Sequence, residues 1–148
     1  MFTLECQQQL PLTLKESWDF FSSPKNLEKM TPSHMNFCIT SGEPGKMYAG
    51  QIISYTVNIL PGLKSNWVTE ISHVDDKKMF VDEQRFGPYS MWHHEHIFEE
   101  TNYGTLMTDK VSYKIPFGIL GILVESLFIR AQLRKIFEYR QETLNRLF

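Results

Sequence analysis

The sequence predicts an α+β fold in which one antiparallel sheet is covered by a long C-terminal helix. Residues 36–115 alternate polar and apolar side chains in short runs, separated by turn-forming residues, as strands joined by hairpins do. Residues 119–147 instead repeat apolar side chains at helical spacing. A chain of 148 residues can bury one sizeable core, so we expect a single domain over residues 1–148.

The first 35 residues are expected to form one strand and two short helices. Phe2–Leu10 alternates apolar and polar side chains, which is typical of a half-buried strand. Thr13 and Glu16 have the spacing of a capping box, so we expect a helix over Leu14–Phe21. A second short helix should follow over residues 24–30. Two helices this short cannot form a bundle, so we expect them to plug one end of the sheet.

About six or seven antiparallel strands are expected in total, because their connections have hairpin length. After the first strand, the predicted strands are Phe37–Thr40, Gln51–Leu60, Lys64–Val74, Met79–Arg85, the stretch between the turns Gly87-Pro88 and Asn102-Tyr103-Gly104, and Thr105–Ile115. Pro61-Gly62 is expected to be a tight turn.

The C-terminal region is predicted to be one amphipathic helix of about 40 Å over Ile119–Leu147. Its apolar stripe is expected to comprise Leu123, Leu127, Ile129, Leu133, Ile136, Phe137, Leu144 and Leu147, with Arg140 among the charged residues mostly off it. Such a helix is expected to bury its stripe across the concave face of the sheet.

Composition and charge exclude several classes of protein. The net charge is -2 and the basic residues are spread along the chain, so we expect no nucleic-acid binding. No signal peptide is visible, and the longest apolar stretch, Ile115–Val124, is about half a membrane span. We therefore expect a cytoplasmic protein without stable membrane insertion. Its oligomeric state is left open.

The segment from Gly87 to Glu100 has the most unusual composition, since it contains three of the five histidines. Because side chains alternate along a strand, His94 and His96 should share one face, with His93 on the other. His94 and His96 would lie roughly 6.6 Å apart along the strand, a spacing that can share a metal ion.

A metal site is nevertheless not expected here, although Asp82 or Asp109 could supply a third ligand. The stretch partly resembles the first histidine motif of cupins, but its glycine spacings differ. No histidine follows His96, so the later histidine that a cupin needs is missing. We expect no metal ion and no other cofactor.

The predicted order of elements resembles the helix-grip fold of the START/Bet v 1-like superfamily, also known as SRPBCC or polyketide-cyclase-like. A narrower resemblance is to bacterial ligand-binding SRPBCC proteins, which are sometimes called cell-division-inhibitor-like. The segments that carry this resemblance are Phe80-Val81-Asp82-Glu83-Gln84, Gly87-Pro88-Tyr89, Trp92-His93-His94-Glu95-His96-Ile97-Phe98, Gly104-Thr105, Asp109-Lys110-Val111-Ser112-Tyr113, Pro116-Phe117-Gly118 and Ile136-Phe137-Glu138-Tyr139-Arg140. The resemblance covers nearly the whole chain. It carries no catalytic residue over to this sequence.

In such a fold, the inner face of the sheet and the long helix enclose a pocket. From the alternation of side chains, the predicted ligand-binding residues are Trp67, Asp82, Gln84, Trp92, His94, His96, Phe98, Met107, Asp109, Val111 and Tyr113, with Ile71, Phe80, Leu127 and Leu133 as further lining. We expect Asp82 and Asp109 to hydrogen-bond the histidines or Gln84, since buried ionisable groups without partners are costly.

The leading functional hypothesis is non-covalent binding of a small hydrophobic molecule, lipid- or polyketide-like, with a polar head. Two alternatives stay open: a cyclase- or hydratase-like enzyme in which a histidine oriented by an aspartate acts as general acid–base, and a protein-interaction module with a vestigial pocket. The histidine–aspartate network could also serve only to fix adjacent strands. The sequence does not decide whether the protein is an enzyme.

Overall fold

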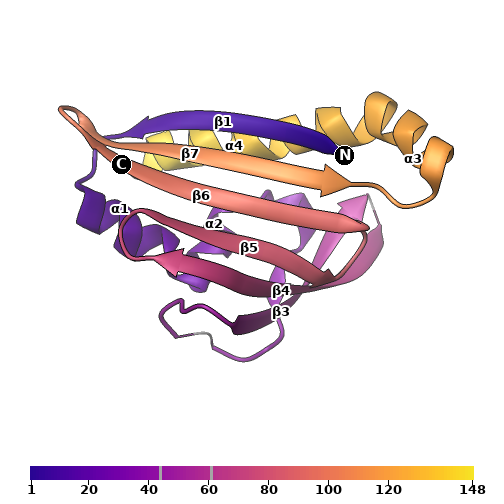
Figure 1. Cartoon of the computed structure of the whole chain (residues 1–148), viewed down its shortest axis with the longest axis horizontal. Coiled ribbons are helices and arrows are strands. Elements are labelled where there is room, and N and C mark those ends of the chain that lie inside the picture. The colour runs from indigo at the N-terminus through magenta and orange to yellow at the C-terminus, as the bar shows by residue number, and fades with distance from the viewer. Residues whose placement is uncertain (44, 61) are drawn as a thin grey trace.

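The computed structural model describes residues 1–43, 45–60 and 62–148. Seven strands form one antiparallel sheet in the order β1-β7-β6-β5-β4-β3-β2, and a long helical segment ends the chain. Figure 1 shows this helical segment running behind β1 and β7. The predicted α+β architecture is therefore confirmed.

The strands match their predicted positions closely, except at one edge of the sheet. Their bounds are β1 (Phe2–Leu10), β2 (Cys38–Ile39), β3 (Gln51–Leu60), β4 (Leu63–Asp75), β5 (Met79–Phe86), β6 (Met91–Thr101) and β7 (Gly104–Lys114). β2 is shorter than predicted, because only its two residues pair with β3. β3 and β4 pair as far as Leu60 and Leu63. The predicted Pro61-Gly62 turn falls between them, and its Pro61 lies outside the described residues.

Two short helices follow β1, as expected. They are α1 (Leu14–Phe21) and α2 (Leu27–Met30), with 3₁₀ turns at Pro24–Asn26 and Ser33–Met35. The capping box at the start of α1 is present: the Glu16 N–H donates to Thr13 Oγ1 at 3.2 Å, and the Thr13 N–H donates to Glu16 Oε2 at 2.9 Å. Trp18 of α1 packs edge-on against Phe98 of β6, with ring centroids 5.6 Å apart. α1 therefore closes one end of the inner face of the sheet.

The C-terminal helix is less regular than predicted. It consists of α3 (Gly118–Val124), a π-helical turn (Glu125–Ile129) and α4 (Arg130–Leu147). A π turn carries an extra residue, so the apolar positions on its two sides do not form one stripe. Leu123 and Leu127 are 54% and 66% exposed, and Leu147 is also exposed, against expectation. α3 projects past the end of the sheet (Figure 1).

The apolar core has two parts, and a polar cluster lies between them. One part, under α4, includes Val111 and Tyr113 of β7. The other, under α1, includes Met107 of the same strand. Asp109 sits between these positions on the same face and is 7% exposed. A carboxylate buried there requires charged or hydrogen-bonding partners.

Candidate ligand-binding site

Three neighbouring strands place two histidines and two aspartates side by side on the inner face. Asp82 of β5 pairs in register with His94 of β6, and Asp109 of β7 pairs with His96. Because residues two apart on a strand share a face, the four side chains converge. Both histidines are 6% exposed. We call Asp82, His94, His96 and Asp109 the histidine–aspartate cluster.

Each ring nitrogen of the two histidines faces an aspartate oxygen. His94 Nε2 lies 2.9 Å from Asp109 Oδ1, and His96 Nε2 lies 2.8 Å from Asp82 Oδ2, both as hydrogen bonds. The other two distances are 3.3 Å from His94 Nδ1 to Asp82 Oδ2 and 3.1 Å from His96 Nδ1 to Asp109 Oδ1. In these last two pairs, a ring nitrogen lies close to a carboxylate oxygen, but the geometry is not that of a hydrogen bond. The predicted hydrogen bonds between aspartates and histidines are confirmed.

The cluster is strongly charged in spite of its burial. Burial alone would raise the pKa of Asp109, but the Arg140 guanidinium and hydrogen bonds from His94 and His96 outweigh it and hold that pKa well below its usual range. Burial likewise opposes a lowered pKa at Asp82, and the two histidines overcome it. Burial would lower the pKa of His94, yet the two aspartates raise it to about 9. At neutral pH, His94 is therefore protonated between two carboxylates.

Arg140 of α4 completes the charge balance. Its Nη1 lies 3.3 Å from Asp109 Oδ1, and the residue is 7% exposed. The guanidinium carbon lies 5.3 Å from the ring centroid of Phe21 and 5.9 Å from that of Phe137, within the range of cation–π attraction. With protonated His94, Arg140 balances the two carboxylate charges.

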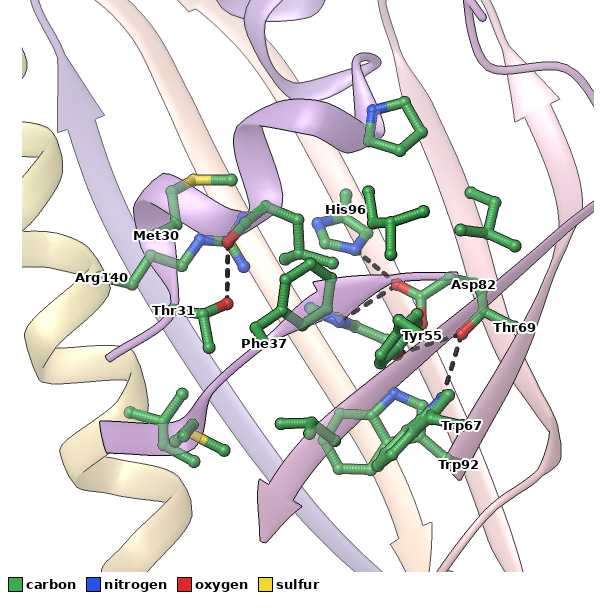
Figure 2. Close-up of a pocket in the computed structure, with 18 of the residues that line it drawn as sticks. Met30, Thr31, Phe37, Tyr55, Trp67, Thr69, Asp82, Trp92, His96 and Arg140 are labelled. Carbon is green, nitrogen blue, oxygen red and sulfur yellow. Dashed lines mark hydrogen bonds and ion pairs between the residues drawn. The ribbon is translucent and has the colours of Figure 1, made fainter. Parts of the chain in front are cut away.

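A cavity of about 210 Å³ adjoins the cluster. It is bounded by the inner face of the sheet, α2 and α4, and its lining is mostly apolar, with Met30, Met35, Phe37, Ile53, Val57 and Trp67 among its members. Polar lining groups include Asp82, His94, His96 and Arg140. Figure 2 shows Arg140 reaching in from α4, with Asp82 and His96 joined on the sheet side. Such an apolar cavity with a few converging polar groups is the usual form of a small-molecule site.

The remaining polar groups of the sheet wall satisfy one another. Trp67 Nε1 donates to Thr69 Oγ1 at 3.0 Å, and the Tyr55 hydroxyl lies 3.3 Å from the same oxygen (Figure 2). Phe80 stacks on the His96 ring, with centroids 4.1 Å apart. These contacts hold the wall in one arrangement, so the cavity is shaped before any molecule enters it.

Comparisons with solved structures match this architecture over the whole chain. A START superfamily protein from Mycobacterium smegmatis has a TM-score of 0.73 and 10% identity, with 99% of each chain covered. A protein from Thermus thermophilus has a TM-score of 0.69 and 16% identity, covering 97% of this chain and 94% of that one. A Chromobacterium violaceum protein has a TM-score of 0.69 and 11% identity, with 95% of each covered. The chain has the START/Bet v 1-like fold.

At these identities the likeness concerns the START-like fold alone, which supports a ligand-binding domain in general. No family model matches the sequence, and no curated protein is similar to it. The narrower resemblance to bacterial ligand-binding SRPBCC proteins thus stays a prediction. No helix in the described part of the chain is long and apolar enough to cross a membrane.

The START-like fold brings some of the predicted site residues to the cavity and not others. Trp67, Asp82, Trp92, His94 and His96 line it. Gln84, Phe98, Met107, Asp109, Val111 and Tyr113 do not belong to its lining, and neither does Leu127. Asp109 nevertheless supports the cavity wall, because it contacts both histidines on the side away from the cavity.

These residues lie away from the cavity because α1 and α4 cover one part of the inner face. Phe98 and Met107 are packed under α1 and the end of α4, in the cluster that contains Trp18. Val111 and Tyr113 are packed under the start of α4, in the cluster that contains Leu133. The cavity is left over the part of the sheet nearer β3.

Gln84 is occupied by a turn rather than by the cavity. Its side-chain amide donates to the Tyr89 carbonyl at 2.6 Å and accepts from the Tyr89 N–H at 3.1 Å, which closes the β5–β6 connection. Gly87 allows this, since a Cβ there would lie 2.5 Å from Gln84 Oε1.

Arg140 is the main site residue that the sequence reasoning missed. It was assigned to the charged side of the helix, whereas it is buried and lines the cavity. A signal was present: Leu133, Phe137, Arg140 and Leu144 follow the spacing i, i+4, i+7, i+11 of one buried helical face. An arginine on such a face needs a buried acid opposite, and Asp109 is that acid.

Proposed function

We propose that the protein binds one small hydrophobic molecule non-covalently in the cavity, with an oxygen-bearing head group facing the histidine–aspartate cluster. The observation that carries this proposal is the uneven lining, which is apolar on most sides and charged on one. An apolar body would displace water from the apolar walls, and the charged wall would fix its orientation.

The volume limits the size of the proposed ligand. About 210 Å³ exceeds the roughly 150 Å³ cavity that accommodates benzene, and it is smaller than pockets for drug-sized molecules. A molecule of one or two rings, or a short acyl chain, fits this range. Met30, Met35 and Met47 line the cavity, and their flexible side chains allow modest expansion.

The charged wall favours a ligand that accepts hydrogen bonds. Arg140 lines the cavity, and its buried Nε–H has no hydrogen-bond partner among the described residues, whereas both nitrogens of His94 face aspartates. A hydroxyl, carbonyl or carboxylate group of a ligand can accept from this N–H. A purely hydrocarbon ligand would remove water from this wall without giving the Arg140 Nε–H a partner, so we expect it to bind more weakly.

A cyclase- or hydratase-like activity is the second candidate, because His94 lines the cavity and holds a proton between two carboxylates. Mass spectrometry separates the two functions. A binding protein returns a co-purified ligand unchanged after incubation, whereas an enzyme converts it.

The proposal is tested with 2-naphthoate, a two-ring fluorescent probe whose size suits the cavity and whose carboxylate suits the charged wall, and with a pair of variants. Ile53 lines the cavity and is 5% exposed, whereas Ile52 on the opposite face of β3 is 52% exposed. Ile53→Phe should fill the cavity and weaken probe binding at least about tenfold, and Ile52→Phe should leave it unchanged. Absence of probe binding to the wild type, or equal binding by both variants, would contradict the proposal.

A further inference from the structure

We propose that Asp82, His94 and His96 also form a site for one divalent transition-metal ion, of the Zn²⁺ or Fe²⁺ kind, on the cavity wall. One oxygen of Asp82 and one nitrogen of each histidine lie within 4.8 Å of one another. All three residues line the cavity. The inference rests on this geometry and not on the proposed binding of a hydrophobic molecule.

The distances suit a metal ion with little movement of the side chains. Four ligands at about 2.0–2.1 Å in a tetrahedron lie about 3.3 Å from one another. Asp82 Oδ2 is 3.3 Å from His94 Nδ1 and 2.8 Å from His96 Nε2. The two histidine nitrogens lie within 4.8 Å of one another, so an ion among these three atoms requires only adjustments of the side chains.

The opposite nitrogen of His94 is already held as a metal-binding histidine requires, and that of His96 lies close to the same carboxylate. A histidine that binds a metal through one nitrogen usually donates its other N–H to a carboxylate or carbonyl, which fixes the ring. Asp109 Oδ1 lies 2.9 Å from His94 Nε2 and 3.1 Å from His96 Nδ1. Arg140 in turn pairs with Asp109. The cluster thus divides into three ligands on the cavity side and a supporting carboxylate beneath them.

The ligand set indicates which ions fit and what they could bind. Two imidazoles and one carboxylate suit Zn²⁺ with an open fourth position, and also match the facial set of non-haem Fe²⁺ sites. The open positions face the cavity, since all three ligands line it. A metal ion here would coordinate the oxygen-bearing head group of a bound molecule.

The outer face of β6 carries the matched control. His93 Nδ1 lies 2.8 Å from Glu83 Oε1, and His93 Nε2 lies 3.5 Å from Glu95 Oε1. This group also places a histidine beside carboxylates, but it lies on the opposite side of the strand, away from the cavity. His93→Gln therefore removes a histidine from the same strand without touching the proposed site.

Isothermal titration of chelator-treated protein with ZnCl₂ tests the site. We expect one equivalent of Zn²⁺ to bind per chain. Asp82→Asn and His96→Gln should each lower the affinity for Zn²⁺ by at least about 100-fold, and Asp109→Asn should lower it by about 10–100-fold. His93→Gln should match the wild type. Wild type that binds no zinc at about 100 µM, or His93→Gln that loses as much as Asp82→Asn, would overturn the proposal.

A second measurement needs no variant that risks misfolding. Zn²⁺ should raise the Tm of the wild type and of His93→Gln alike, because an ion that binds only the folded state stabilises it. An unchanged wild-type Tm counts against the site. Probe binding by chelator-treated protein tests the proposed function separately, so either proposal can fail while the other holds.

A different surface carries an independent inference. Eight large apolar side chains around α3 and the π-helical turn are 44–81% exposed: Phe117, Ile119, Leu120, Ile122, Leu123, Val124, Leu127 and Phe128. At 100° per residue, those from Ile119 onward cover an arc of roughly 240° around the helix. Gly121 and Glu125 occupy the buried side. We infer that this segment, residues 117–128, docks into the surface of an anionic lipid bilayer.

The arc and the charges favour lipid over a protein partner. An interfacial helix buries its apolar face at the boundary between head groups and acyl chains, and a broad arc of large apolar side chains suits that environment. Lys114, Arg134 and Lys135 flank the segment, whereas Arg130 pairs with the buried Glu125, the only acid from 114 to 135. Basic flanks attract anionic head groups with about 1 kcal/mol each. Figure 1 shows α3 projecting past the sheet, where a flat surface could reach it.

Co-sedimentation with vesicles of phosphatidylcholine and phosphatidylglycerol at 3:1 tests this docking. The wild type should bind the vesicles, and so should Leu63→Asp, a control at an exposed apolar position of β4. The double variant Leu120→Asp with Leu127→Asp should lose at least about tenfold in affinity for the vesicles. Binding should weaken with salt and with vesicles of phosphatidylcholine alone. Lack of vesicle binding, or a dimer in solution that the double variant abolishes, would overturn the inference.

Discussion

Replacing Arg140 by methionine tests whether the buried charges act as one unit. The substitution keeps an unbranched apolar stem but removes the cation that faces Asp109 at 3.3 Å. Breaking a buried ion pair on one side costs about 3–5 kcal/mol, because it leaves the other charge without compensation. Asp109 keeps His94 at 2.9 Å and His96 at 3.1 Å, so we expect the lower end of that range.

A loss of about 3 kcal/mol in the free energy of unfolding corresponds to a Tm lower by about 6–12 °C for a chain of this size. Urea denaturation followed by circular dichroism measures it. Arg134→Met, at an exposed position of the same helix, should change stability by less than about 0.5 kcal/mol. A loss below about 1 kcal/mol in Arg140→Met would refute the reasoning, since the pair would then not hold the cluster.

Three further predictions concern stability. In metal-free protein, the pKa of His94 is about 9 in the folded state and roughly 6.5 in the unfolded state. Protonation of His94 therefore contributes about 3 kcal/mol to the free energy of unfolding. This contribution is complete below pH 6.5 and is lost as the pH rises through 9. The titratable groups that face this ring are Asp82, His96 and Asp109, and Arg140 pairs with Asp109. Urea titrations at pH 6, 7.5 and 9 should show this fall, and His94→Gln should abolish it. Tyr113→Phe removes the hydroxyl that donates to the buried Glu125 carboxylate at 2.8 Å, although Arg130 still donates to it, and should cost about 1–2 kcal/mol by thermal melting, whereas Tyr103→Phe, 81% exposed, should not. Thr13→Ala removes the cap of α1 and should lower the free energy of unfolding by about 1 kcal/mol in urea; an unchanged value would show that packing alone holds α1.

The alternation of polar and apolar side chains was enough to predict the strands of the sheet, because successive side chains of a strand lie on opposite faces. β1, β3 and α1 begin and end at their predicted residues, and His94, His96, Asp82 and Asp109 share the predicted face. A period of two fixes the face on which a side chain lies. It does not fix which part of that face a helix covers.

That limit explains the errors in the predicted lining. Phe98 and Tyr113 are on the right face, but α1 and α4 bury them away from the cavity. Long-range placement of a helix depends on which strands it contacts, and no local spacing encodes it. Arg140 differs, since its spacing along the helix indicates burial, but its partner Asp109, 31 residues earlier in the chain, is identified only by the tertiary structure. The cavity residues on α2 and β3 could be found only from tertiary contacts.

The π-helical turn Glu125–Ile129 bears on how this chain tolerates changes in length. A π turn holds one residue more than the α-helical turn that it replaces, so deleting one residue between 125 and 129 can restore a continuous α-helix. The helix upstream would then rotate by about 100° relative to α4. The apolar side chains of α3 would point elsewhere, while α4 and the histidine–aspartate cluster would stay in place. A single codon lost here would thus re-aim one surface of the protein, and it would also remove or displace the buried Glu125 that pairs with Tyr113.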